Sequence, residues 1–164
     1  MAETMFAPDY LAPPGDTLQE ALEERSMTQA ELARRMGRPK KTINGIIHGS
    51  IQITPETALA LERVLDIAAS FWLNLENQYR EALARLADDQ HLREHVGWLK
   101  RFPLKEMIKR GWLEKAPDAL QQLRVLLRFF GVATPQQWDV LYQDDLIAYR
   151  KARTISSNTD TSFR

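Results

Sequence analysis

Two short helices joined by a tight turn are predicted between Thr28 and Gly49, and this segment constrains the fold more than any other. Thr28 is a favourable N-cap residue, and Glu31 three residues later predicts a capping box. Gly37 can adopt the left-handed conformation that ends a helix. We therefore expect one helix to lie between Thr28 and Gly37, and a second to follow it and end at Gly49.

The second of these helices has two chemically different faces. Ile43, Ile46 and Ile47 are spaced as one apolar stripe, at positions i, i+3 and i+4. The opposite face is polar and carries Lys40, Lys41, Asn44 and His48. A short helix with a buried stripe and a cationic outer face fits the DNA major groove. The alternative is a helical hairpin in an ordinary core, with a solvated basic edge.

The basic character of this segment is local. The chain has 22 basic and 22 acidic residues, so its composition predicts no general attraction to nucleic acid. No acidic residue lies between Leu32 and Pro55. The basic residues of that stretch are Arg34, Arg35, Arg38, Lys40 and Lys41. These charges favour DNA binding by this segment alone.

The order of these residues resembles the helix-turn-helix of the XRE family, the lambda-repressor-like regulators. The resemblance is carried by TQAELARRMG (28–37) and KKTINGIIHG (40–49). It continues through Ile53–Leu65 and Phe71–Tyr79, which resemble the HigA-type antitoxin branch. The resemblance implies an all-α fold, with a five-helix lambda-repressor-like DNA-binding domain, a long helix and a small C-terminal helical subdomain.

The family's DNA contacts are transferred only to matching positions. Lys40, Lys41 and Asn44 match positions that reach bases or the adjacent backbone, and Lys can donate to guanine O6 and N7 while Asn can pair with adenine. Gln29 matches a residue that contacts a DNA phosphate. From their own chemistry and position, we also expect phosphate contacts from Arg34, Arg35, Arg38, Thr42 and His48. Gly45 stands where relatives often place a base reader, so we expect few base contacts.

These observations predict a sequence-specific regulator of transcription that binds double-stranded DNA. We expect a repressor that also acts on its own promoter, with no enzymatic activity and no cofactor. The alternative is an antitoxin of a HigBA-like toxin–antitoxin module, which binds and neutralises a toxin protein and represses its own operon. An apolar stripe from Trp72 to Leu86 predicts a homodimer, which suits a palindromic operator. Packing of this stripe against the C-terminal half of the same chain is the other possibility.

Four regions are expected along the chain. They are an extended arm (1–14), the DNA-binding domain with its long fifth helix (15–88), a helical C-terminal subdomain (89–153) and a disordered tail (154–164). In the third region, Phe102–Leu104, Lys109–Leu113 and Leu127–Val132 resemble a longer XRE group, in which such a segment precedes a C-terminal metallopeptidase-like domain.

One catalytic motif competes with this interpretation. His91-Leu-Arg-Glu-His95 matches the H-x-x-E-H pattern of some zinc peptidases, and makes a zinc hydrolase using His91, Glu94 and His95 a remote alternative. A catalytic zinc also needs a third ligand, and no residue is marked for that role. We therefore expect an ordinary exposed helix there, without a metal.

The absence of cysteine and of targeting or membrane-spanning patterns indicates the cellular compartment. The chain contains no Cys, which excludes disulfides and Cys-ligated metal sites. It also has no signal peptide pattern and no apolar run of about 18 residues. We expect a cytoplasmic protein that does not bind membranes.

Overall fold

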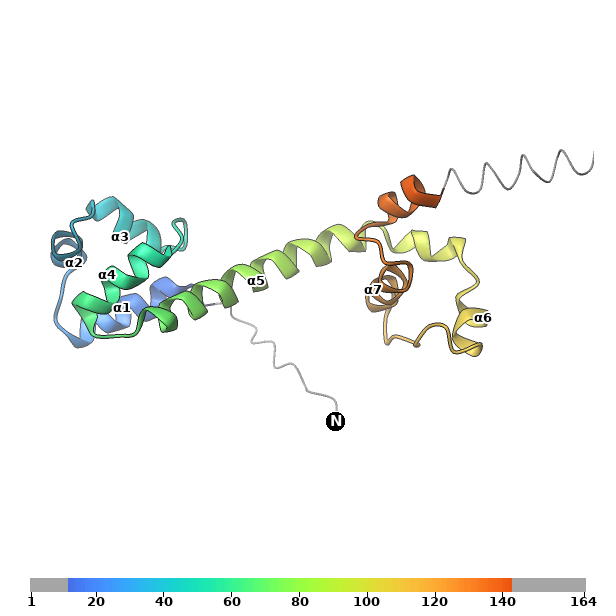
Figure 1. Ribbon diagram of the computed structural model, residues 1–164, viewed down its shortest axis with the longest axis horizontal. Helices are drawn as coiled ribbons and strands as arrows, with labels where there is room; N and C mark the ends of the chain where they lie inside the picture. The colour runs from blue at the N-terminus through green and yellow to red at the C-terminus, as the bar shows by residue number, and fades with distance from the viewer. Residues whose placement is uncertain (1–11, 143–164) are drawn as a thin grey trace, which may run out of the picture. The chain divides into compact units, whose positions relative to one another are not determined.

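The structure, a computed structural model, describes residues 12–142, and within that range it contains helices and no β-strand. The all-α fold class is therefore confirmed for this part of the chain (Figure 1). The first helices are α1 (Pro14–Glu24), α2 (Gln29–Met36), α3 (Lys40–Ile47), α4 (Pro55–Leu65) and α5 (Ala69–Arg93). They are followed by the 3-10 helix η1 (Val96–Arg101), α6 (Leu104–Lys109), α7 (Ala119–Phe130) and a helix over residues 135–142. Most of the expected arm and all of the expected tail lie outside the described residues.

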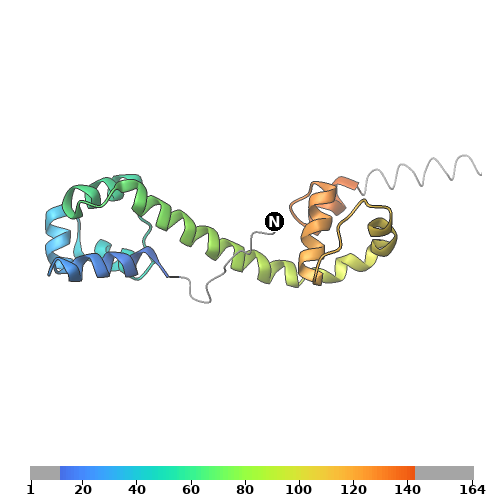
Figure 2. The ribbon, with the colours of Figure 1, turned by 90° about the horizontal axis from the view of Figure 1, so that it is seen from below.

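The chain divides into two compact units, Met1–Ala87 and Asp88–Arg164, and α5 contributes residues to both. In the first unit, α1 to α4 surround one apolar core that also takes in Trp72 from the start of α5 (Figure 2). The side chains buried to 2% exposure or less include Leu18, Leu22, Leu32, Ile43, Ile46, Leu61, Leu65 and Trp72. Each such side chain contributes roughly 1.5–3 kcal/mol through burial, so the core holds α3 firmly in place.

The predicted helix ends are set by local hydrogen bonds. Thr28 Oγ1 accepts from the Glu31 backbone N–H at 3.1 Å, and Thr54 Oγ1 accepts from Thr57 at 3.3 Å. Gly37 ends α2 with a φ of 62°, in the left-handed region. The capping box is only half formed, because the Glu31 carboxylate turns to two arginines of its own helix instead.

The N-terminus of α1 packs directly against the end of α3. A Cβ atom at Gly15 would lie 2.0 Å from the carbonyl oxygen of Ile47 and 2.3 Å from its Cα. Real non-bonded atoms do not approach that closely, so only glycine allows this contact. Gly15 therefore fixes how close α3 lies to α1.

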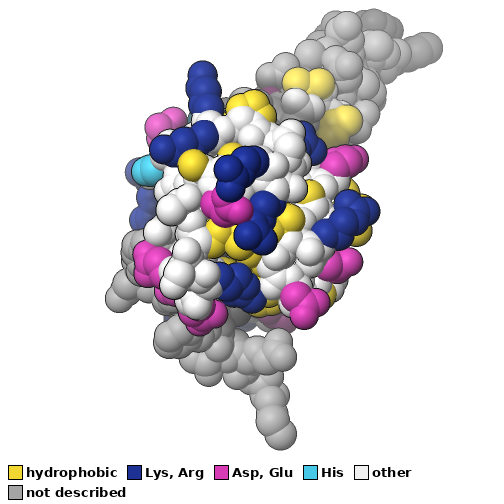
Figure 3. Space-filling view, turned by 90° about the vertical axis from the view of Figure 1, so that its left-hand side faces the viewer, with side chains coloured by type: hydrophobic (Ala, Val, Ile, Leu, Met, Phe, Trp, Pro, Cys, Tyr) yellow, Lys and Arg dark blue, Asp and Glu magenta, His cyan; other side chains and the backbone are white. Residues whose placement is uncertain are grey.

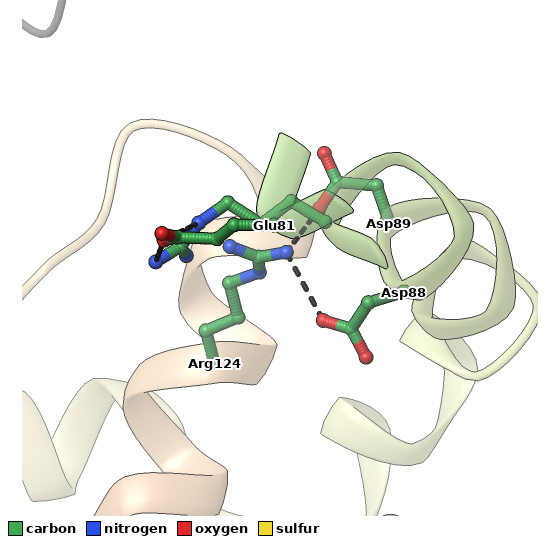
Figure 4. Close-up of polar contacts among 5 residues, drawn as sticks. Glu81, Asp88, Asp89 and Arg124 are labelled. Carbon is green, nitrogen blue, oxygen red and sulfur yellow. Dashed lines mark hydrogen bonds and ion pairs between the residues drawn. The ribbon is translucent and has the colours of Figure 1, made fainter. Parts of the chain in front are cut away.

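The second unit has its own apolar core. Its buried side chains come from the end of α5, η1, α6, α7 and the loop before α7: Leu92, Trp98, Leu99, Met107, Leu113, Leu120, Leu123, Leu126 and Leu127. Arg124 of α7 binds Asp88 at 3.2 Å and also binds Asp89, which ties α7 to this end of α5 (Figure 4).

The helix expected at His91–His95 is only partly present, because α5 ends at Arg93 and η1 begins at Val96. Two large aromatic side chains of this unit, Trp112 and Phe129, remain 54% and 46% exposed. Among the described helices, none combines the length and the apolar character that crossing a bilayer requires.

Candidate nucleic-acid interface

The structure places the three predicted base-reading residues together on the outer side of α3. Lys40, Lys41 and Asn44 are exposed, while Ile43 and Ile46 on the opposite side are buried to 0% and 1%. The Asn44 side-chain amide has no hydrogen bond to another described residue. All three side chains can therefore donate outward without first breaking a contact.

The cationic side chains near α3 differ in whether they form ion pairs with carboxylates. Neither Lys40 nor Lys41 forms an ion pair with any residue in the described range. Arg34 and Arg35 both bind the carboxylate of Glu31, with 2.7 Å between Arg35 Nε and Glu31 Oε1. The Arg35 hydrogen bond, helped by the charges of both arginines, holds the pKa of Glu31 below its ordinary value. Phosphates must compete with Glu31 for these two predicted contacts.

Arg38, on the turn between α2 and α3, has a small electrostatic influence on Glu56. Hydrogen bonds from the Glu56 backbone N–H and the Thr54 hydroxyl, and then the charge of Arg38, lower the pKa of Glu56. Glu56 stands in the first turn of α4, where the helix dipole also favours a carboxylate. Arg38 itself forms no ion pair with a described residue, so Arg38, Lys40 and Lys41 differ from Arg34 and Arg35, which are paired with Glu31.

The remaining predicted phosphate contacts already have partners or partial cover. Nδ1 of His48 lies 2.8 Å from the carbonyl oxygen of Asn44. Because a carbonyl oxygen can only accept a hydrogen bond, Nδ1 carries the proton. Nε2 of His48 can then donate to a phosphate only when the ring is an imidazolium. Gln29 is half-buried and donates to Gln19 at 3.4 Å, and Thr42 is half-buried on α3.

Gly45 does not belong to this outer face. It is buried, and a Cβ at this position would lie 2.5 Å from Ile51 Cδ1. A side chain at this position would therefore meet Ile51, and the expectation of few base contacts stays a prediction. A larger residue there would push against the loop after α3.

The face of the first unit that Figure 3 shows does not present one sign of charge. In the view of Figure 3, lysine and arginine side chains are interspersed with carboxylates and apolar side chains. This matches the zero net charge of the whole sequence. Attraction to a duplex must then come from the few cations around α3.

Comparison with known proteins agrees with this geometry. A family model described as Helix-turn-helix matches residues 18–72, from within α1 to the first turn of α5. YddM, an uncharacterized HTH-type transcriptional regulator of Escherichia coli (strain K12), is 36% identical over 84 residues, which are 51% of this chain and 89% of that protein. The chain belongs to the HTH-type transcriptional regulators.

Other relatives and solved structures match part of this HTH-type regulator. An uncharacterized HTH-type transcriptional regulator of Haemophilus influenzae is 37% identical over 39% of this chain and 61% of its own length. A HigA-family addiction module antidote protein from Coxiella burnetii is 28% identical, covering 50% of this chain and 90% of its own, with a TM-score of 0.45. The Pseudomonas aeruginosa antitoxin HigA, solved with the higBA promoter, is 33% identical over 49% of this chain and 89% of its own, with a TM-score of 0.46. The likeness of the second unit to the segment preceding a metallopeptidase-like domain stays a prediction.

The residues that position the loop after α3 in this HTH-type regulator were not predicted from the sequence. Glu76 of α5 is 6% exposed and accepts from the Ile53 backbone N–H at 3.0 Å. Arg80 donates to Glu76 at 2.6 Å and to the Gly49 carbonyl at 3.1 Å. Two side chains of α5 therefore hold both ends of the Gly49–Ile53 loop. The available signal was an acidic residue four positions after Trp72, within the apolar stripe, and a basic residue four positions later.

The H-x-x-E-H motif, His91–His95, lies outside the first unit. His91, Glu94 and His95 belong to the second unit, and their ligand atoms all lie within 4.8 Å of one another. They are not part of the α3 surface.

Proposed function

We propose that this chain binds operator DNA as a homodimer and represses transcription by placing α3 in the major groove. The observation that carries this proposal is the pair of unpaired lysines beside the free amide of Asn44, opposite Ile43 and Ile46 in the core. A helix anchored in this way enters a groove as a rigid unit. The backbone of α3 then loses little conformational freedom on binding, and the ordering cost falls on the exposed side chains.

The DNA contacts divide by chemistry. Lys40, Lys41 and Asn44 read base edges, and each good contact provides roughly 1–3 kcal/mol of discrimination. Phosphate contacts fix the register of the protein on the duplex, and they come from Gln29, Arg34, Arg35, Arg38, Thr42 and His48. Arg34 and Arg35 contribute less than free arginines because Glu31 offsets part of their charge.

Exposed leucines on α5 support pairing with a second copy. Leu83 and Leu86 are 38% and 56% exposed, in the part of α5 that belongs to the first unit. Covering them in a two-fold dimer removes apolar surface from water and gives two equivalent α3 helices. Such a dimer matches a palindromic site whose half-sites lie about 34–36 Å apart.

Selection of bound fragments from random and genomic DNA tests the proposal. We expect a palindromic sequence, with a copy upstream of the chain's own gene, and lower reporter expression from that promoter when the protein is present. Recovery of fragments without a shared sequence contradicts specific recognition. Higher expression from the promoter contradicts repression.

A second candidate function is that of an antitoxin. The sequence resemblance of Ile53–Leu65 and Phe71–Tyr79 to the HigA-type branch supports it. In this case the chain also binds and neutralises a toxin protein encoded by an adjacent small gene. Co-expression of the two genes, followed by purification of one product, tests this directly. Failure of the neighbour's product to co-purify, or its harmlessness when expressed alone, contradicts the antitoxin function.

A further inference from the structure

The turn at the end of α5 gathers three side chains that can bind a metal ion. His91 lies in the last turn of α5, and Glu94 and His95 follow directly after that helix. One ring nitrogen from each histidine and one carboxylate oxygen of Glu94 lie within 4.8 Å of one another, and the ring centroids are 4.9 Å apart. All three residues belong to the second unit, so their arrangement depends on that unit alone.

The backbone explains why these three meet. The Glu94 N–H donates to the His91 carbonyl at 3.2 Å, and the His95 N–H donates to the Leu92 carbonyl at 2.9 Å. Hydrogen bonds between residues three apart tighten the helix end and place side chains i and i+3 above one another. Leu92, 3% exposed, anchors the inner side of this turn in the core. The outer side then presents the two rings and the carboxylate.

These donors are available for an ion. His91 and Glu94 are exposed, and their side chains form no hydrogen bond or ion pair with another described residue. His95 is half-buried, and its Nε2 lies 3.1 Å from the side-chain nitrogen of Gln136. If the side-chain amide of Gln136 is rotated by 180°, its oxygen can accept a hydrogen bond from one ring nitrogen of His95. The other ring nitrogen then points outward, as in metal-bound histidines that are held by an outer partner.

The donor set suits a borderline divalent transition metal. Two imidazole nitrogens and one carboxylate bind Zn²⁺ at about 2.0–2.2 Å, which requires ligand atoms roughly 3.3 Å apart. Exposed side chains can close the remaining gap by rotation about their χ angles. Thiolate ligands are excluded because the chain has no Cys, and a site made only of oxygen ligands, as Mg²⁺ prefers, is absent from this turn.

We propose that His91, Glu94 and His95 form a binding site for one Zn²⁺-like ion per chain. In this assignment Glu94 is a metal ligand and does not act as the general base that activates a water molecule. The ion ties the last turn of α5 to the turn that leads into η1. Its binding therefore stabilises the second unit, because the unfolded chain does not hold the three ligands together.

The test uses the full chain prepared without a histidine tag. Zn²⁺ is titrated by calorimetry, and melting curves are recorded with Zn²⁺ and with Mg²⁺. We expect one Zn²⁺ per chain, and a rise in Tm with Zn²⁺ but not with Mg²⁺. His91→Ala and His95→Ala should each weaken Zn²⁺ binding at least as much as the roughly 10–100-fold loss that follows removal of an outer partner.

His48→Ala is the matched control, since His48 is the one histidine of the three in the sequence that is not a proposed ligand, and it is the C-cap residue of α3. It should bind Zn²⁺ as the unaltered protein does. Circular dichroism of each variant without metal separates loss of ligands from loss of folding. The site is contradicted if His91→Ala/His95→Ala retains the full affinity and stoichiometry, or if His48→Ala loses them.

Discussion

The carboxylate of Glu76 lies 3.0 Å from the backbone nitrogen of Ile53, 23 residues earlier in the chain, and accepts its hydrogen bond. Arg80 closes the arrangement by binding both Glu76 and the carbonyl of Gly49. The loop that follows α3 is therefore held by α5. This relationship connects the stability of the first unit to the placement of α3.

Glu76→Ala should lower the free energy of unfolding by roughly 2–4 kcal/mol, because it leaves the Ile53 N–H without its acceptor and the Arg80 guanidinium without its carboxylate. The figure lies below that for a fully buried pair, since the Arg80 side chain is 30% exposed. Urea unfolding followed by circular dichroism measures it. Glu81→Ala is the control: Glu81 pairs with Arg85 on the exposed surface of the same helix, and its loss should change stability by less than about 1 kcal/mol. Equal effects of the two substitutions contradict the role of Glu76.

Gly15→Ala should destabilise the first unit by about 3 kcal/mol, at the upper end of the usual cost of overpacking. The added methyl group meets the backbone of Ile47, which cannot turn away as a side chain can. Gly97→Ala is the matched control, because a Cβ there has no neighbour within 4 Å. Thermal melts of the two variants should differ clearly, and a neutral Gly15→Ala contradicts the contact between α1 and α3.

The salt dependence of operator binding should reflect the pairing of Arg34 and Arg35 with Glu31. If a dimer neutralises about eight phosphates, the slope of log K against log salt is about −7. Glu31→Gln frees about one further cation per half-site and should steepen the slope to about −9. Fluorescence anisotropy over a range of salt concentrations gives both slopes. An unchanged slope contradicts competition between Glu31 and the phosphates.

The same competition has a pH signature. In the free protein the Arg35 hydrogen bond keeps the pKa of Glu31 low. Phosphates that draw the arginines away raise this pKa, so the complex takes up protons as it forms. Affinity of the unaltered protein should therefore increase as the pH falls into the range where Glu31 titrates. Glu31→Gln should lose that part of the pH dependence.

Leu83→Glu/Leu86→Glu should convert the proposed dimer to a monomer, because two charges then stand on the surface that the second copy covers. Sedimentation velocity measures the oligomeric state, and operator affinity should fall with it. Leu59→Glu is the control, since Leu59 is 44% exposed on α4. A dimer that survives the double substitution places the interface elsewhere.

The helix-turn-helix could be predicted because its signals are local. Thr28, Gly37 and Thr54 act on hydrogen bonds within a few residues of their own positions, and the structure bears each of them out. The contacts that sequence reasoning missed join distant residues, such as Gly15 with Ile47 and Glu76 with Ile53. Nothing in a local pattern indicates which helix approaches which at such points, and the pairing depends on the packed core as a whole.

The charges on the candidate interface were also predictable only in part. Sequence spacing identified the outward side of α3, because helical periodicity fixes which residues share a face. It did not separate the free cations, Lys40 and Lys41, from the arginines held by Glu31. That distinction depends on side-chain orientation, which the sequence leaves open.

The affinity of Lys41→Ala/Asn44→Ala for the selected operator tests most directly whether α3 reads DNA through its outer face. Lys115→Ala/Asn77→Ala is the matched control, because it removes the same two residue types from exposed positions outside α3. We predict that the first variant melts like the unaltered protein but binds the operator at least about tenfold more weakly, since each base contact provides roughly 1–3 kcal/mol. The control should bind normally. Full operator affinity in Lys41→Ala/Asn44→Ala would contradict the account.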